Sequence, residues 1–240
     1  ILKCKKAKVM TKSSDSVNPR VSTKHVTTKP SHTANPNSKP NYDVIVVGGG
    51  PAGMIAAGRA AELGARVALL EKNDKLGKKL LITGGGRCNI TNAEFDVKKL
   101  IAKYGRKGKS LHSAFARFSA EDTFEFFQSK GLQLKIEAEQ RAFPVSNKAE
   151  DVWKVLVKYM KDNGVKVLTD HAVRKVLSAN GQITGVKTAK HGILTARAYI
   201  IATGGKSRPE TGSTGQGFEW MSETTASSDV PAAADVDVPD

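Results

Sequence analysis

A pattern of glycines between a predicted strand and a predicted helix constrains this chain more than any other feature. The apolar, β-branched run 44–47 is typical of a strand buried on both faces of a parallel sheet. Gly48, Gly50 and Gly53 follow it with the spacing G-x-G-x-x-G, and Pro51 suits the first turn of a helix. In such a unit the first glycine permits the turn, the second lets a pyrophosphate approach the backbone, and the third lets helix and strand pack closely. The pattern predicts a dinucleotide-binding βαβ unit.

The residues that follow complete this unit. A helix rich in small residues is expected up to Leu63, with its N-terminal N–H groups directed at phosphates and Gly64 as its end. A second strand is expected over 66–70, and Glu71 follows it, 18 residues past Gly53, where it could accept hydrogen bonds from ribose hydroxyls. An ordinary glycine-rich turn would not need the strand, the helix and the terminal acid together. These residues alone leave both FAD and NAD open.

Composition and cysteine usage favour an intracellular globular protein. The chain has 240 residues, of which 39% are hydrophobic. Its longest uncharged run, 44–58, is 15 residues long, shorter than the roughly 20 that a membrane span needs. Cys4 and Cys88 lie far apart, so we expect no disulfide framework and a reducing compartment. The expected location is the cytoplasm, or an organelle if the basic N-terminal segment is a presequence.

The net charge of +15 is unevenly distributed. Residues 1–41 hold nine Lys or Arg and one acid in a polar segment that we expect to be a disordered tail. Residues 221–240 hold five acids and no Lys or Arg, and we expect an irregular acidic tail there. Between the tails, 29 basic residues face 17 acids, dispersed and not interleaved with aromatic residues. We therefore expect no nucleic-acid partner, with binding through the basic tail as the alternative.

A second glycine segment lies further along the chain. Three consecutive glycines, 84–86, precede Arg87 and Asn89. Such a backbone can lie against a flat ring or a phosphate, with donors from the two polar side chains beside it. Cys88 lies between them, but it has no C-x-x-C partner, so we expect it to serve packing and not redox exchange.

Taken together, these segments resemble the aminoacetone oxidase or BaiN-like family of FAD-dependent flavoproteins. The resemblance is carried by residues 43–53, 70–72, 76–79 and 83–89, and further by Arg141, Phe143, Pro144, Ser146 and the run 202–215. It implies an α/β, Rossmann-like FAD-binding domain of the two-dinucleotide flavoprotein type. It moves the choice of cofactor from NAD to FAD, with NAD(P)H as a candidate electron donor.

The resemblance also implies a cofactor site assembled from several segments. The expected contacts with pyrophosphate, ribose, flavin and adenine come from Gly48, Gly50, Pro51, Ala52, Gly53, Glu71, Lys72, Gly85, Gly86, Arg87, Cys88, Asn89, Val173, Ala202, Thr203 and Gly204. Val173 would touch the adenine through its backbone. Arg87 is the side chain expected to tune the flavin or the substrate, because a fixed cation favours an anionic reduced flavin. We assign no catalytic base and expect no metal site.

The expected domain spans 42–220, with a helical excursion at about 95–163 and a β-meander at about 165–195. Ser119 with Asp122, and Asn147 with Glu150, have the spacing of helix N-terminal caps. Asn180-Gly181 is a hairpin signal. His171 and His191 are expected to be solvated positions of the exposed meander.

The expected function is that of an FAD-dependent oxidoreductase that transfers hydride to or from an unidentified small molecule, without a membrane partner. Members of the resembling family continue beyond the segments matched here, so we expect a C-terminally truncated form of that architecture. A non-catalytic dinucleotide-binding fragment is therefore one alternative, and nucleic-acid binding through the basic tail is another. The oligomeric state is not assigned.

Overall fold

A computed structural model describes residues 40–226 of the chain. Almost all of the predicted basic tail, 1–41, and most of the predicted acidic tail, 221–240, therefore lie outside the described residues.

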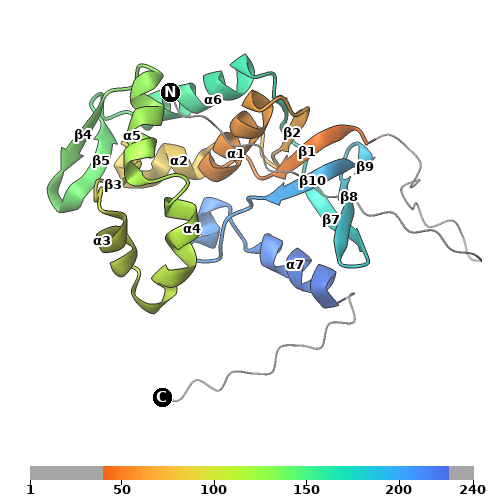
Figure 1. Cartoon of the computed structure of the whole chain (residues 1–240). Helices are drawn as coiled ribbons and strands as arrows, with labels where there is room; N and C mark the ends of the chain where they lie inside the picture. The colour runs from red at the N-terminus through yellow and green to blue at the C-terminus, as the bar shows by residue number, and fades with distance from the viewer. Residues whose placement is uncertain (1–39, 227–240) are drawn as a thin grey trace, which may run out of the picture. The chain divides into compact units, whose positions relative to one another are not determined.

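The centre of the described chain is a four-stranded parallel sheet (Figure 1). Its strand order is β10 (Ala196–Ile201), β1 (Tyr42–Val47), β2 (Val67–Leu70) and β6 (Lys166–Leu168). In β1, Val44 pairs with Ala198 on one side and with Val67 on the other. The first strand within residues 40–226 is thus an inner strand, as its uninterrupted apolar run predicted.

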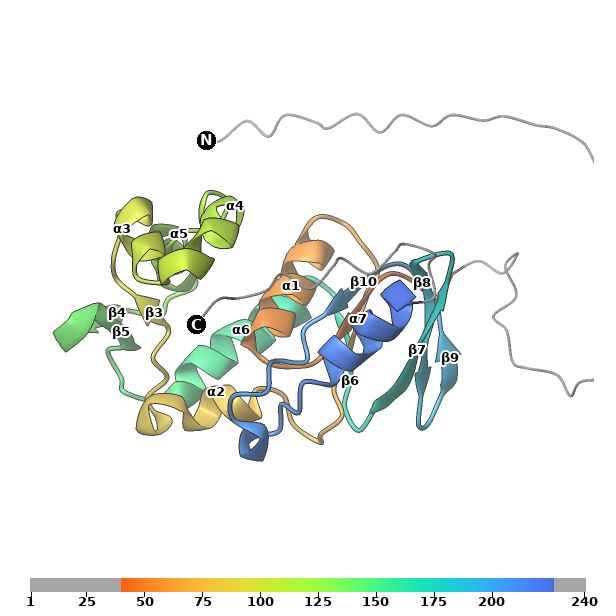
Figure 2. The same ribbon diagram turned by 90° about the horizontal axis from the view of Figure 1, so that it is seen from below.

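Alternate residues of these strands face two different hydrophobic cores, because side chains of a strand point to opposite faces in turn. Val46 and Leu69 pack with helices α1 (Pro51–Glu62) and α6 (Ala149–Asp162) on one face. The two helices run side by side over the sheet (Figures 1 and 2). Ile45 and Leu70 contribute to the second core on the other face.

The second core lies under an antiparallel sheet and a C-terminal helix. The sheet contains β7 (Val173–Ala179), β8 (Gln182–Thr188) and β9 (Gly192–Leu194), and α7 (Gln216–Ala226) packs beside β7. Asn180 and Gly181 join β7 to β8 with φ values of 52° and 70°, which confirms the predicted hairpin. Trp220 of α7 is buried in this core.

A long excursion, residues 78–144, separates β2 from α6. The helix α6, which the sequence prediction included in the excursion, packs on the central sheet instead. The elements of the excursion are α2 (Lys78–Ile82), the 3₁₀ turn Thr83–Gly86, β3 (Thr91–Asn92), α3 (Val97–Ala102), the 3₁₀ segment Gly105–Leu111, α4 (His112–Phe115), α5 (Ala120–Ser129), β4 (Leu134–Glu137), the 3₁₀ turn Ala138–Gln140 and β5 (Arg141–Pro144). Ser119 and Asp122 form the predicted capping box at the start of α5. Phe127 of α5 packs into the same core as α1 and α6, which attaches the excursion to the rest of the fold.

The domain organisation predicted from the sequence is wrong in two further places, one within this excursion and one after it. The excursion is not purely helical, because β3, β5 and β4 form a three-stranded antiparallel sheet. The meander begins at Val173 and not near residue 165, because β6 joins the parallel sheet beside β2. The amphipathic helix α6 returns the chain across the sheet, and such a crossover places the next strand parallel to β2.

Two expected helix boundaries are also wrong. Asn147 has φ 56° and is not a helix cap; α6 begins after Lys148 without a side-chain cap. The irregular acidic tail expected from residue 221 is helical up to Ala226, because α7 continues through Met221, which packs on the core that buries Trp220.

Candidate functional site

The carboxyl ends of β1, β2 and β10 open into a cavity of about 700 Å³. Ligands of open α/β sheets bind at this edge, and this volume lies in the range of cofactor sites. The residues that line it come from six segments of the chain: Val47 to Ala52, Leu70 to Asn73, Gly77 to Lys79, His171 to Arg174, Ile201 to Gly204, and a final stretch from Thr211 to Met221.

Three glycines shape the wall of the cavity at the end of β1. Gly48 has φ 109°, and a Cβ there would lie 2.5 Å from the carbonyl oxygen of Ala202. A Cβ on Gly53 would overlap the carbonyl oxygen of Gly48, so helix α1 packs directly on the turn. Gly50, in contrast, has open space beside its Cα. Gly48 and Gly53 therefore allow close packing, while Gly50 leaves room for a group that approaches the backbone.

Helix α1 directs its N-terminus at this space. Gly50 is its N-cap, Pro51 occupies the first turn, and both residues line the cavity with Ala52. No side chain caps this end, and no acidic residue lies in its first turn. The partial positive charge of the helix N-terminus is therefore available to an anion in the cavity.

Glu71 holds the glycine turn in place from the end of β2. The side chain is 7% exposed, and its Oε2 accepts a 2.7 Å hydrogen bond from the backbone N–H of Gly49. Its Oε1 accepts bonds from the backbone N–H and the side-chain amide of Asn73, at 2.9 and 2.5 Å. An ionised carboxylate has about four acceptor positions, so three bonds leave capacity for one more donor, such as a ribose hydroxyl.

The charged residues that line the cavity are mostly basic. Glu71 is the single acid among them, whereas the cations are Lys72, Lys78, Lys79 and Arg174. Lys72 Nζ donates to the carbonyl oxygen of Gly212, and Lys79 Nζ donates to Ser213 Oγ, each at 2.6 Å. These two bonds hold the 211–214 loop against the end of the sheet, and the surplus of positive charge suits a pyrophosphate.

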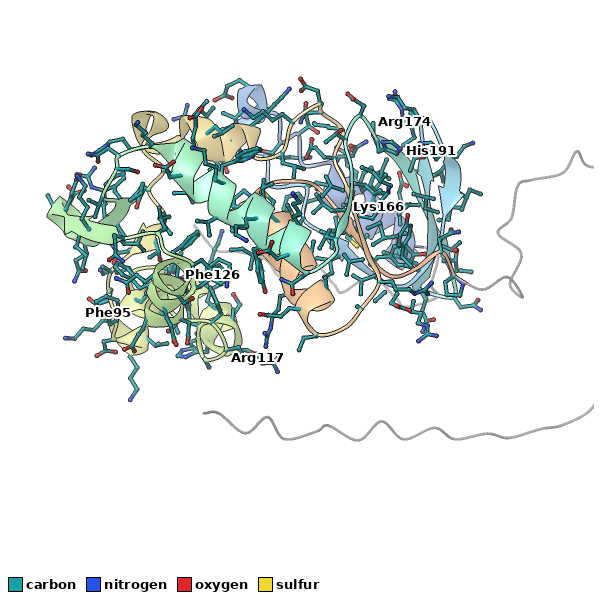
Figure 3. All side chains as sticks on the ribbon, turned by 90° about the horizontal axis from the view of Figure 1, so that it is seen from above. Phe95, Arg117, Phe126, Lys166, Arg174 and His191 are labelled. Carbon is teal, nitrogen blue, oxygen red and sulfur yellow. The ribbon has the colours of Figure 1, made fainter. Side chains whose placement is uncertain are left out.

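His171 lies in the wall of the cavity, and its expected solvated position is wrong. The side chain is 8% exposed because its ring stacks on His191, with centroids 4.4 Å apart. Its Nδ1 lies 2.5 Å from the carbonyl oxygen of Thr169, and its Nε2 is buried without a hydrogen-bond partner. Its backbone N–H donates to the carbonyl oxygen of Glu71 at 2.8 Å. His191 does remain exposed, and Figure 3 labels it on the antiparallel sheet.

The second glycine segment does not line this cavity. Gly84, Gly85 and Gly86 all have φ between 60° and 81°, and this left-handed run turns the chain toward the β3-β5-β4 sheet. There the Arg87 guanidinium lies 4.0 Å from the centroid of the Phe143 ring and pairs with Glu137 at 2.9 Å. Contact of this segment with a flavin therefore stays a prediction.

The structure thus brings together part of the predicted site. Ten predicted residues line the cavity: Gly48, Gly50, Pro51, Ala52, Glu71, Lys72, Val173, Ala202, Thr203 and Gly204. Gly53 lies behind the turn, and five residues lie in the second glycine segment: Gly85, Gly86, Arg87, Cys88 and Asn89. Burial raises the pKa of the Cys88 thiol to about 11, in agreement with a packing role.

Sequence reasoning missed several lining residues. Asn73, Lys79 and His171 were not nominated, nor was the 211–214 loop. Lys79 and Ser213 are 134 residues apart, and no local pattern relates them. The glycine-rich run in which this loop lies was a usable signal, because a loop without bulky side chains can approach a ligand closely.

A model of a known protein family matches residues 42–231, and its description is "HI0933-like protein Rossmann domain". The chain belongs to the HI0933-like family. Its parallel sheet, glycine turn and cavity are those of an FAD-binding Rossmann-like fold, as the resemblance implied.

Two curated relatives of this HI0933-like chain have assigned activities. The "3-dehydro-bile acid delta(4,6)-reductase" of Clostridium scindens is 33% identical over 72% of this chain. The "ribosomal RNA dihydrouridine synthase" of Escherichia coli is 30% identical over 74% of it. The matched segment covers 41% and 43% of these relatives, so the chain spans about two fifths of their length.

Solved structures support the fold. The 3-ketosteroid-delta4-(5alpha)-dehydrogenase of Rhodococcus jostii has a TM-score of 0.55 at 20% identity, covering 70% of this chain and 47% of its own. A flavocytochrome c3 fumarate reductase has the same TM-score at 24% identity, covering 71% of this chain and 35% of its own. At these identities the likeness concerns the architecture alone.

The residues present fit the adenine dinucleotide part of FAD. The open space at Gly50, the uncapped N-terminus of α1 and the basic lining suit a pyrophosphate, and Glu71 has acceptor capacity left for a ribose. Within residues 40–226, none of the helices has the length and apolar character of a membrane span.

Proposed function

We propose that this HI0933-like chain acts in a flavin-dependent reductase that saturates a carbon–carbon double bond conjugated with a carbonyl group. The observation that carries the proposal is the bond change shared by the two relatives. A delta(4,6)-reductase of a 3-dehydro bile acid removes double bonds conjugated with a ketone, and a dihydrouridine synthase removes the double bond beside a uracil carbonyl. The sequence leaves the small-molecule substrate unidentified. From the two relatives, a small enone is the first candidate substrate class, and an RNA uridine is the second.

The residues around the cavity have defined tasks in this proposal. The backbone at Gly50 and Ala52 binds the pyrophosphate, and Glu71 orients a ribose while it holds the turn at Gly49. Lys72 and Lys79 close the 211–214 loop over the cavity, which reduces the access of water. FAD, when bound, supplies hydride transfer, and NAD(P)H is the proposed source of electrons.

The test starts with the purified chain and its absorption spectrum, with any released cofactor identified after heat denaturation. We expect flavin bands and released FAD, or the uptake of added FAD. A chain that takes up NAD and not FAD would contradict the proposal. Anaerobic reduction with NADH or NADPH then reports the electron donor through loss of the flavin absorption.

The substrate class is tested with two probes in the same assay. One is a 3-oxo steroid with a conjugated double bond, and the other is a uridine-containing RNA, each followed by product mass. Gain of two hydrogens by either probe is the expected result, and it identifies the substrate class. A flavin that NAD(P)H reduces but neither probe reoxidises would overturn the proposal for this chain and favour the non-catalytic alternative.

A further inference from the structure

One stretch of the excursion carries positive charge that no acid within it balances. We call residues 97–118 the basic segment. It contains seven Lys or Arg and no Asp or Glu, and all seven side chains are exposed: Lys98, Lys99, Lys103, Arg106, Lys107, Lys109 and Arg117. Lys103 pairs with Glu94 at 3.7 Å, and the other six form no ion pair within residues 40–226. Most of this charge is therefore available to an external anion.

Exposed aromatic rings lie among these cations. Tyr104 is 52% exposed and lies beside Phe115, with ring centroids 6.2 Å apart. Phe118 is 41% exposed and lies 6.5 Å from Phe126 in an edge-on arrangement. Each exposed ring thus packs against a second ring. It already has few conformations in the free protein, so it loses little conformational entropy when it binds a ligand.

Two aliphatic side chains of the basic segment point into the protein and not toward solvent. Leu100 and Ile101 of α3 are only 4% and 6% exposed. A helix that binds a membrane surface places aliphatic side chains outward, and it is usually longer than the six residues of α3. Cations combined with exposed rings instead match single-stranded nucleic acid, where phosphates meet Lys or Arg and bases stack on aromatic rings.

The elements that carry the basic segment, α3, the 3₁₀ segment and α4, contact one another. Asp96, the acid nearest the segment, accepts hydrogen bonds from the backbone N–H groups of Lys98 and Lys99 as the cap of α3. Gly108 is buried against the carbonyl oxygen of Ile101, which folds the 3₁₀ segment back on α3. The expectation of no nucleic-acid partner rests on dispersed cations without interleaved aromatic residues, whereas this segment combines clustered cations with exposed rings. Figure 3 shows Arg117 on this part of the molecule.

We propose that the basic segment is a docking surface for single-stranded RNA. Its cations would contact phosphates, and Tyr104 and Phe118 would stack on bases. The choice of RNA over DNA rests on the proposed function, because uracil carries a double bond conjugated with a carbonyl group. Docking itself requires no flavin, so it can be measured separately from turnover.

The test measures fluorescence anisotropy of a labelled, uridine-containing RNA of about 20 nucleotides, added to the full chain. The triple variant Arg106→Glu, Lys107→Glu, Lys109→Glu should bind the RNA at least about tenfold more weakly, because repulsion replaces three phosphate contacts. The matched control reverses three exposed lysines elsewhere, Lys161→Glu, Lys187→Glu and Lys190→Glu, and it should retain at least half of the affinity.

A second variant separates stacking from charge. Tyr104→Ala combined with Phe118→Ala keeps every cation, and it should weaken RNA binding by about thirtyfold or more, because it removes two stacked bases that each contribute at least about 1 kcal/mol. Circular dichroism of each variant confirms that it is folded.

Three outcomes would overturn the proposal. The first is an equal loss of affinity in the control triple variant, which would assign the binding to net charge or to residues 1–41. The second is unchanged binding in both the charge and the ring variants. The third is tighter binding of the full chain to vesicles of phosphatidylserine and phosphatidylcholine than to RNA. Failure of the flavin experiment would leave these results intact, because RNA binding is measured without cofactor.

Discussion

At the scale of single residues, Glu71 performs two tasks with one carboxylate. Three donors already bind it, and they come from Gly49 and Asn73. The ribose contact expected from the sequence would therefore form on a group that also fixes the phosphate-binding turn. Sequence spacing could predict the acid but not its bond to Gly49, because that bond depends on how a turn 22 residues earlier is folded.

Glu71→Gln tests this double role. The amide NH₂ would replace one acceptor oxygen, so a donor from Gly49 or Asn73 would lose its partner, at a cost of about 1–3 kcal/mol. We expect a lower free energy of unfolding in urea and a weaker uptake of FAD. The exposed Glu125→Gln in α5 makes the same chemical change and should shift stability by less than about 0.5 kcal/mol. Equal effects of the two variants would contradict the role given to Glu71.

At the scale of elements, the contact between α1 and α6 depends on one glycine. A Cβ on Gly58 would overlap the ring of Tyr159, whose hydroxyl donates to Glu62 at 2.9 Å. The ring also lies edge-on to Phe126 of α5, with centroids 5.0 Å apart. One tyrosine thus joins three helices, because the helix that faces it has no side chain at that position.

Gly58→Ala should therefore destabilise the fold, although alanine is the better helix former by about 1 kcal/mol. Overpacking costs about 1–3 kcal/mol, which exceeds the gain in helix propensity. In a Tyr159→Ala background the same substitution has room, and it should become neutral or stabilising. Thermal unfolding of the wild type, the two single variants and the double variant measures the coupling energy between the two positions. If the effects of the two substitutions simply add, Gly58 and Tyr159 are not coupled and the prediction is contradicted.

The secondary structure was largely predictable where local chemistry decides it. The glycine turn, the Ser119 capping box and the Asn180-Gly181 hairpin follow from residues within a few positions of one another. The pairing of β6 with β2 could not be predicted in this way. A three-residue strand is too short to show an alternation of apolar and polar residues, and the crossover through α6 determines which strand β6 pairs with. The β3-β5-β4 sheet was missed for the same reason, since β3 is only two residues long.

At the scale of the whole molecule, the core that holds the excursion to the central sheet contains Cys88. The side chain is 4% exposed and packs in the same cluster as Phe127 and Met160. Exposure of this thiol therefore requires separation of the excursion from the helices on the sheet.

The candidate site likewise depends on segments that are far apart in the sequence. Its wall combines residues near position 50 with a loop near position 212, and sequence spacing alone does not reveal that contact.

Thiol labelling of a Cys4→Ser variant should report this opening. At pH 8, the raised pKa of Cys88 alone reduces its thiolate fraction about 100-fold relative to an unfolded thiol, and burial slows the reaction further. The pKa of the Cys88 thiol is about 9.0 in the unfolded chain and about 11 in the folded chain. The contribution of this thiol to the free energy of unfolding is therefore fully present below pH 9. It is lost as the pH rises toward 11, because the unfolded chain releases the proton first. Labelling by iodoacetamide that is equally fast in buffer and in urea would contradict the buried position.

The strand order described for the central sheet also has a consequence during protein synthesis. β1 is made first, yet its neighbour β10 lies 154 residues later along the chain, measured between Asn41 and Thr195. At a translation rate of about 5–20 residues per second, roughly 8–30 s separate the two strands at the ribosome. During that interval one edge of β1 has no partner, and the wall formed by Ala202 and the 211–214 loop does not yet exist. The complete wall of the cavity can therefore form only after residues 202–214 have been synthesised.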